Sequence, residues 1–122
     1  MVSTCNISLQ ANEDYLVISL EGDYDYDTWI KLPQTILQES IRTGIKKVLV
    51  YGLEVTPTAT SAIDRLLLAE EVVETLGKRI YLALVWHRDY TTGQLEAFAA
   101  KHESPVRMFH TFEDAEGWLR SL

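Results

Sequence analysis

Two segments near the start of the chain, residues 4–10 and 15–20, alternate between apolar and polar residues. Their apolar positions share one side of each segment: Cys5, Ile7 and Leu9 in the first, and Leu16, Ile18 and Leu20 in the second. Alternation with a period of two predicts a β-strand with one buried face. The short ANED link between the two strands favours an antiparallel hairpin, and Gly22 is predicted to end the second strand.

Two later segments, residues 48–51 and 80–86, are continuous apolar runs rich in β-branched and aromatic residues. Such runs are typical of strands covered on both faces, as in a parallel sheet with crossover helices. A short last strand is predicted at residues 106–109, directly after Pro105.

A first helix is predicted to begin near residues 25–28, where Asp and Thr side chains are suited to cap it, and to end before Gly44. Its helically spaced positions are Ile36, Leu37, Ser40 and Ile41. Pro33 removes one helical hydrogen bond and clashes with the preceding turn. We therefore expect either a kink at Pro33 or a short first turn, after which Pro33 opens the main helix.

Three further helices follow from the spacing of apolar residues. The second carries Ala62, Leu66, Ala69, Val73 and Leu76 and is predicted to stop at Gly77. The third, near residues 92–102, places Leu95, Phe98, Ala99 and His102 on one face, and His102 is expected to be packed there. The fourth has Phe112, Ala115, Leu119 and Leu122 as its buried stripe, and Thr111 with Asp114 forms a variant of the capping box.

These elements predict an α/β fold with the order β-β-α-β-α-β-α-β-α. Right-handed crossovers would give a mixed sheet of about five strands, with an antiparallel N-terminal hairpin, parallel βα units and four helices. The 122 residues show no linker, repeat or low-complexity segment, so residues 1–122 are predicted to form a single domain.

Composition narrows the range of functions. The net charge of −7 opposes binding to nucleic-acid phosphates, and no basic run is longer than Lys46–Lys47. The single cysteine excludes an intrachain disulfide, and residues 1–10 lack the pattern of a signal peptide. No apolar run approaches the length of a membrane span. A cytoplasmic protein without an integral membrane segment is therefore expected.

Two local patterns resemble a known family. The stronger lies at the C-terminus, where VRMF at residues 106–109 is followed by EDAEGWL at residues 113–119. It is similar to the short strand and "acidic-acidic-Ala-x-x-Trp-Leu" helix that close many SpoIIAA-like proteins of the STAS fold. The weaker pattern, residues 48–68, is similar to the strand, turn and helix that carry the regulatory serine of anti-sigma-factor antagonists. The resemblance implies a regulatory module, and it extends in fold to the lipid-binding CRAL-TRIO domains.

The turn before the second helix is the first candidate site. It offers Thr58, Thr60 and Ser61, which the resemblance marks as contact residues or phosphoacceptors, although regulatory members carry Asp-Ser-Ser-Gly where this chain has Ala59-Thr60-Ser61-Ala62. A phosphate at a helix N-terminus would be stabilised by the free N–H groups there. The alternative is that Thr60 or Ser61 simply caps the helix, with Asp64 completing a capping box.

Aromatic residues form the second candidate site. Six of them are placed to line an apolar cleft between the first two helices and the strand ends: Tyr24, Tyr26, Trp29, Tyr51, Trp86 and Tyr90. The alternatives are core packing for the two tryptophans and a subunit interface for the tyrosines.

Catalytic and metal-binding patterns are weak. His87 and Asp89 follow the fourth strand, at the same end as the Thr-rich turn, but the Gly-x-Ser-x-Gly elbow of a hydrolase is missing. The three histidines have no ligand-like spacing, so we expect no metal, no cofactor and no enzymatic activity. The leading hypothesis is a non-catalytic STAS-like module that binds another protein or a second copy of itself. The alternative is a protein that binds a small apolar molecule or lipid in the cleft.

Overall fold

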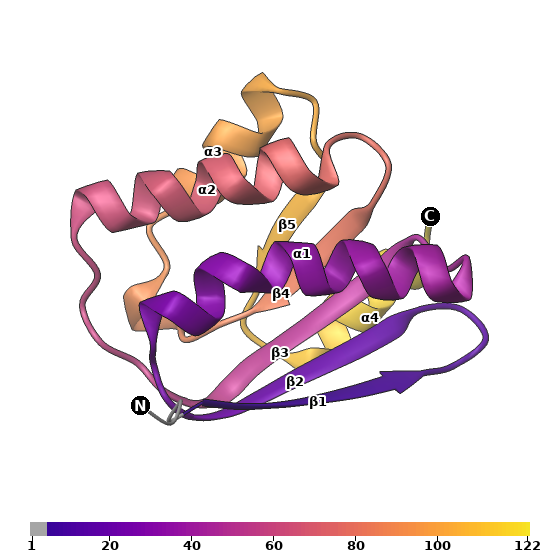
Figure 1. Ribbon diagram of the computed structural model, residues 1–122, viewed down its shortest axis with the longest axis horizontal. Helices are drawn as coiled ribbons and strands as arrows, with labels where there is room; N and C mark the ends of the chain where they lie inside the picture. The colour runs from indigo at the N-terminus through magenta and orange to yellow at the C-terminus, as the bar shows by residue number, and fades with distance from the viewer. Residues whose placement is uncertain (1–4) are drawn as a thin grey trace.

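A computed structural model, which describes residues 5–122, contains one five-stranded sheet and four α-helices (Figure 1). The strands are β1 (Cys5–Ala11), β2 (Leu16–Asp23), β3 (Lys47–Thr56), β4 (Tyr81–Val85) and β5 (Val106–Phe109). The helices are α1 (Tyr26–Thr43), α2 (Ala62–Leu76), α3 (Gln94–Lys101) and α4 (Phe112–Arg120), and a short 3₁₀ turn, η1 (Arg88–Tyr90), follows β4. Residues 1–4 lie outside the described residues. They include Thr4, the predicted start of the first strand, and part of the segment that lacks a signal-peptide pattern.

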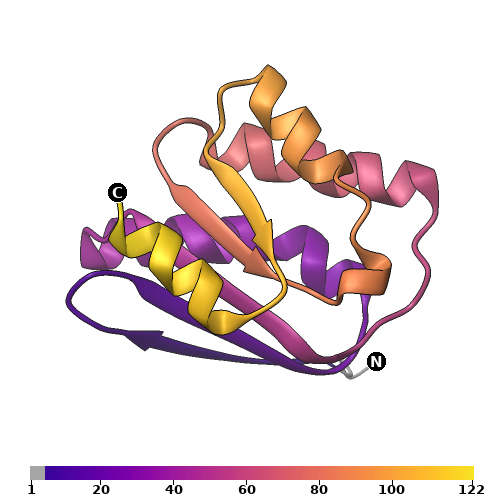
Figure 2. The same cartoon turned by 180° about the vertical axis from the view of Figure 1, so that it is seen from behind.

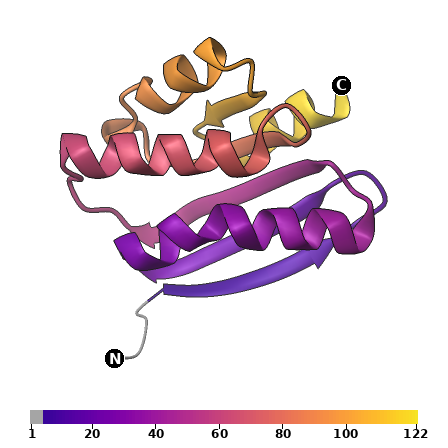
Figure 3. The same cartoon turned by 45° about the horizontal axis from the view of Figure 1, so that its top comes forward.

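The strands follow one another across the sheet in the order β1-β2-β3-β4-β5. β1 pairs antiparallel with β2, and every later pair is parallel, which confirms the predicted mixed sheet. Because each parallel strand is added on the same side of the last, right-handed crossovers place α1, α2 and α3 on one face. α4 lies on the opposite face (Figure 2). Figure 3 shows α1 and α2 side by side, with both N-termini at the end where the parallel strands finish.

Alternation along the central strands divides the core in two. On β3, Val48 and Val50 pack with α1 and α2, whereas Leu49 packs on the other face with Ala115 and Leu119 of α4. All five of these side chains are fully buried. Both faces of β3 are therefore covered, as the continuous apolar run at residues 48–51 predicts.

A bulge interrupts the pairing of β2 with β3. From Ser19 to Glu21 the β2 strand advances two residues, while β3 advances three, from Tyr51 to Glu54. Tyr51 and Leu53 pack on the α4 face, and the extra residue turns Val55 to the α1 face. The prediction that Gly22 ends the second strand is wrong, because β2 continues to Asp23 with Gly22 at φ 112.

The first helix is one continuous element from Tyr26 to Thr43 with Pro33 inside it, so a separate short first turn is not formed. The Pro33 ring is buried against the interior of the molecule, which offsets the loss of one backbone donor. At the C-terminal end, Gly44 adopts φ 75 and its N–H donates to Ser40, as expected of a left-handed cap.

Only part of the predicted stripe on α2 is buried. Ala69 and Leu76 are buried and Val73 is half-buried, but Ala62 and Leu66 are exposed. The buried side of α2 is turned relative to the predicted stripe: Leu68 and Val72 are half-buried and Thr75 is buried, although none of them belongs to that stripe. The stripe residues Ala62 and Leu66 therefore lie toward solvent.

Two further predictions fail at helix ends. Leu122 is exposed because α4 ends at Arg120, and His102 is exposed because it follows the last residue of α3. The His102 ring still lies against Phe98, with 4.7 Å between the ring centroids. The Thr111 cap is confirmed by the hydrogen bond from the Asp114 N–H to its hydroxyl. In the described part of the chain, no helix combines the length and apolarity needed to cross a membrane.

Candidate functional site

The β3–α2 turn at residues 57–61 lies where β3 ends. The Ser61 hydroxyl accepts a hydrogen bond from the Asp64 N–H at 3.1 Å, so Ser61 caps α2 as predicted. The Thr60 hydroxyl donates to the Thr58 carbonyl at 3.3 Å. Arg65 fixes the turn from the first turns of α2, because its guanidinium donates to the Thr60 carbonyl and, at 3.1 Å, to the Gln94 side chain.

An aliphatic surface adjoins this turn. Ile63 is 71% exposed, Leu66 is 40% exposed and Leu67 is 42% exposed. These three residues, which we call the α2 ridge, occupy the first two turns of the helix directly after Ser61. Sequence reasoning placed Leu66 in the core and passed over Ile63 and Leu67. The available signal was that both lie outside the predicted stripe, on the side of the helix that a polar residue normally occupies.

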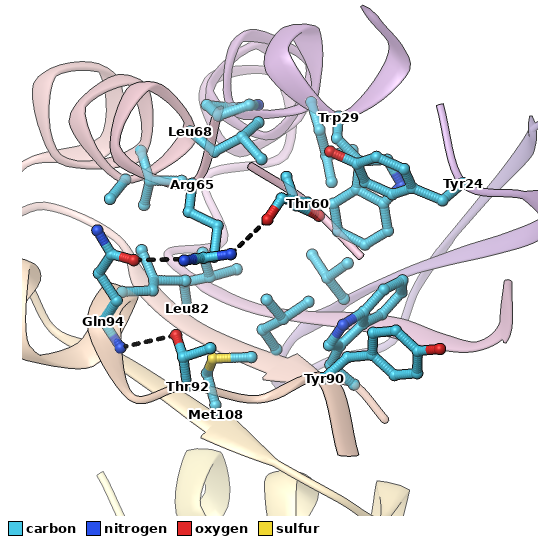
Figure 4. Close-up of a pocket in the computed structure, with 18 of the residues that line it drawn as sticks. Tyr24, Trp29, Thr60, Arg65, Leu68, Leu82, Tyr90, Thr92, Gln94 and Met108 are labelled. Carbon is cyan, nitrogen blue, oxygen red and sulfur yellow. Dashed lines mark hydrogen bonds between the residues drawn. The ribbon is translucent and has the colours of Figure 1, made fainter. Parts of the chain in front are cut away.

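A cavity of about 150 Å³ opens between α1, α2, α3 and the sheet, where the cleft was predicted. Its wall is mostly apolar, and the polar side chains on it include Thr60, Arg65, Thr92 and Gln94 (Figure 4). Figure 4 shows Tyr24 and Trp29 on one side of the cavity and the Arg65–Gln94 pair on the other. We call this cavity the α1–α2 pocket.

Four of the six predicted aromatic residues line the pocket: Tyr24, Trp29, Trp86 and Tyr90. Tyr24 stacks on Trp29 with 6.3 Å between ring centroids, and Trp29 meets Trp86 edge-on at 5.0 Å. The Tyr24 backbone N–H donates to the Thr56 carbonyl at 3.0 Å, which holds Tyr24 beside the end of β3.

The other two aromatic residues lie elsewhere. Tyr51 follows Val50 on β3, so strand alternation turns it to the opposite face of the sheet. There it packs against Phe112 of α4, with 6.0 Å between the ring centroids. Tyr26 is the first residue of α1, one turn before Trp29, and is not part of the pocket wall. The prediction that Tyr51 and Tyr26 line the cleft is therefore wrong.

Two polar atoms of the pocket residues are buried without a hydrogen-bond partner among the described residues: the Tyr24 hydroxyl and the Trp29 Nε1–H. Burial raises the pKa of the Tyr24 phenol, and the nearby Thr60 side chain opposes this shift without forming a hydrogen bond of normal geometry. A buried donor without an acceptor costs about 1–3 kcal/mol. The aromatic side of the pocket therefore contains unsatisfied hydrogen-bonding capacity.

The candidate catalytic residues His87 and Asp89 form no hydrogen bond with the hydroxyls of the β3–α2 turn in the described part of the chain. The His87 Nε2 lies 2.7 Å from the Val55 carbonyl oxygen. Within residues 5–122, no cluster of three or more His, Cys, Asp or Glu side chains is placed to hold a metal ion.

The geometry defines a class of protein first: an α/β domain with three helices on one face of a mixed sheet, and a turn and a pocket where the parallel strands end. No protein-family model matches the sequence, and no curated protein matches it either. Solved structures do. An anti-sigma factor antagonist from Mycobacterium paratuberculosis superposes with a TM-score of 0.61 and 18% identity, over 95% of this chain and 94% of the other.

A second solved structure is an uncharacterised protein of the DUF3478 family from Shewanella loihica PV-4, described as having a SpoIIAA-like fold. Its TM-score is 0.52 and its identity 21%, over 98% of each chain. The present chain therefore has the SpoIIAA-like, or STAS-like, fold that the C-terminal sequence pattern indicated. Neither protein is described as a lipid binder, so the comparisons do not support the lipid-binding alternative.

Proposed function

We propose that this chain is a non-catalytic regulatory module that acts in the cytoplasm by binding another protein. The proposed contact surface consists of Thr58, Thr60, Ser61 and the α2 ridge. The observation that carries the proposal is the α2 ridge itself, because three exposed aliphatic side chains lie together beside a rigid turn. Burying such a surface against a partner is favourable by about 25 cal/mol per Å² of apolar area.

Two further facts support the proposal. The superposed antagonist from Mycobacterium paratuberculosis shares the fold over nearly the whole chain, and its description makes it a regulator of another regulatory protein. Arg65 ties the turn to α3 by donating to the Thr60 carbonyl and to Gln94, and such bonds reduce the conformational entropy that is lost when a partner binds there.

Site-specific photocrosslinking in cells tests this surface with a matched control. Ile63 on the ridge is 71% exposed, and Ile41 near the end of α1 is 73% exposed, so the two positions differ in location and hardly in exposure. We expect crosslinkers at Ile63 and Leu67 to capture the same protein and a crosslinker at Ile41 not to capture it. Ile63→Asp should abolish capture from Leu67, whereas Ile41→Asp should leave it intact.

Equal capture from Ile41 and Ile63, or no captured protein at either ridge position, would overturn the proposal. Folding is not a complication, because both isoleucine side chains are largely solvated and either aspartate is expected to change stability by no more than about 0.5 kcal/mol. The melting temperatures of the two variants check this directly.

Regulation of the surface by phosphorylation is part of the same proposal. Ser61 is exposed, and a phosphate there would place a charge of about −2 next to the α2 ridge. Phosphopeptide mass spectrometry of protein isolated from its native cells distinguishes Ser61 from Thr60 and Thr58. Unmodified hydroxyls at all three positions, under conditions that change partner capture, would remove phosphorylation from the proposal and leave the contact surface in place.

A second copy of the chain is one candidate for the partner. β1 is the edge strand of the sheet and presents Ile7 and Leu9 as exposed apolar side chains. Sedimentation equilibrium is expected to show a concentration-dependent dimer that Leu9→Lys dissociates. A monomer at all concentrations would exclude this edge as an interface without affecting the α2 ridge.

A further inference from the structure

We propose that the α1–α2 pocket is a binding site for a small aromatic molecule that carries a hydrogen-bond acceptor such as a carbonyl oxygen. This inference goes beyond the protein-contact function, because the pocket lies between the helices and the sheet and the α2 ridge faces outward. It rests on three properties of the pocket: its size, its apolar wall and the Trp29 N–H, which is buried without a hydrogen-bond partner among the described residues.

Size limits the ligand. A cavity of about 150 Å³ lined by apolar side chains is large enough to hold one benzene ring, and the α1–α2 pocket has about this volume. The aromatic walls from Trp29 and Trp86 favour a ring that stacks or packs edge-on over an aliphatic chain.

The polar atoms select the ligand further. The Trp29 indole N–H donates and never accepts, so only an acceptor on the ligand satisfies it. On the opposite side, the Arg65 guanidinium donates through Nε to Gln94 and through Nη1 to the Thr60 carbonyl. The Trp29 donor therefore points to an oxygen acceptor on the ligand.

The proposal requires a movement of Tyr24. The Trp29 Nε1 and the Tyr24 hydroxyl are both buried in this structure, where the two rings stack. Tyr24 belongs to the short connection between β2 and α1, and its side chain is partly exposed. A ligand oxygen would reach the Trp29 N–H once the Tyr24 ring turns aside.

The test compares acetophenone with ethylbenzene, which has nearly the same shape and no acceptor. Both are titrated into the full chain while the indole N–H resonances of the three tryptophans are followed by NMR. We expect acetophenone to shift the Trp29 resonance downfield and to bind about two- to tenfold more tightly than ethylbenzene, as one hydrogen bond warrants. The Trp118 resonance, from α4 on the other face, should not move.

Two variants locate the site. Trp29→Phe removes the donor and keeps a ring, so it should abolish the preference for acetophenone while ethylbenzene still binds; Trp118→Phe is the matched control and should preserve the preference. Leu68→Trp fills the pocket and should block both molecules. Absence of acetophenone binding by the wild-type chain, equal affinity for the two molecules, or a preference that survives Trp29→Phe would each overturn the proposal. If Leu68→Trp fails to fold, the Trp29 comparison decides alone.

Discussion

Gly52 is the position where the structure predicts the sharpest response to a single methyl group. A Cβ atom added at Gly52 would lie 2.6 Å from Cε3 and 2.9 Å from Cζ3 of the Trp86 ring, and 3.1 Å from the Val85 carbonyl oxygen. The Trp86 ring is a rigid group held between the β3 backbone and Trp29. The absence of a side chain at Gly52 is therefore what allows Trp86 to lie against β3 and form one wall of the α1–α2 pocket.

The size of the effect follows from these distances. Non-bonded carbon atoms prefer separations of about 3.5–4.0 Å, so the Trp86 ring must move by about 1 Å to accept alanine. Overpacking of this kind costs about 1–3 kcal/mol, and the lower chain entropy of alanine in the unfolded state returns about 0.5–1 kcal/mol. Gly52→Ala should therefore lower the free energy of unfolding by about 1–2 kcal/mol, which corresponds to a melting temperature lower by roughly 3–10 °C for a chain of this size.

Gly117→Ala is the matched control, because a Cβ at Gly117 on the exposed side of α4 meets nothing within 4 Å. Alanine there should stabilise the chain by about 0.5–1 kcal/mol through helix propensity. Urea denaturation measures both variants, with an unchanged slope for a pure stability effect. In a Trp86→Leu background the penalty of Gly52→Ala should shrink to the part caused by the Val85 carbonyl oxygen. If Gly52→Ala is as stable as the wild type, or keeps its full penalty without Trp86, the packing argument is wrong.

Two further predictions concern the helix caps and a buried phenol. Ser61→Ala should lower the free energy of unfolding by about 1 kcal/mol because it removes the cap of α2, and Thr111→Ala should lower it by a similar amount at α4. Urea denaturation measures both variants, and an unchanged free energy of unfolding in either one would contradict the capping geometry. Burial and the Glu116 carboxylate raise the pKa of Tyr15, so its stabilising contribution is complete below the unfolded pKa of about 10 and is lost as pH rises through the folded pKa. Stability measured between pH 9 and pH 11 should therefore fall less steeply for Tyr15→Phe than for the wild type, and parallel slopes would refute the assignment.

The backbone of the fold could be predicted because its signals are local. Alternation marked β1 and β2, and the continuous apolar runs marked the buried strands. Gly44 marked the end of α1, because glycine readily adopts the left-handed backbone found there. Thr111 marked the start of α4, because its hydroxyl caps the helix. The structure confirms each of these elements within a few residues, apart from the strand extensions past Gly22 and to Thr56. The buried face predicted for β1 is not formed, because Cys5 is buried but Ile7 and Leu9 are exposed.

The candidate sites were harder to predict because they depend on which side of an element is covered. The run at residues 48–51 is apolar throughout, so it carries no polar residue to show that Tyr51 faces α4. The first half of α2 is apolar on several sides, so its sequence does not show clearly that Ile63 and Leu67 lie on the side that faces away from the pocket. The volume of the α1–α2 pocket depends on how the side chains around it pack in three dimensions. The periodicity of apolar residues along the sequence does not predict such packing.

Both candidate sites lie at one end of the sheet for a single reason: parallel strands finish at the same edge, and the helices that follow them begin there. Arg65 is the side chain shared by the two sites, because it lines the pocket and also holds the turn through Thr60 and Gln94. A substitution of Arg65 would therefore disturb the turn and the pocket together and would not assign an effect to either. Ile63 and Trp29 separate the two sites, since Ile63 is solvated on α2 and is not part of the pocket wall, whereas Trp29 lines the pocket from α1. If the two sites are independent, Ile63→Asp abolishes partner capture and leaves ligand binding intact. Trp29→Phe then changes ligand binding and leaves partner capture intact.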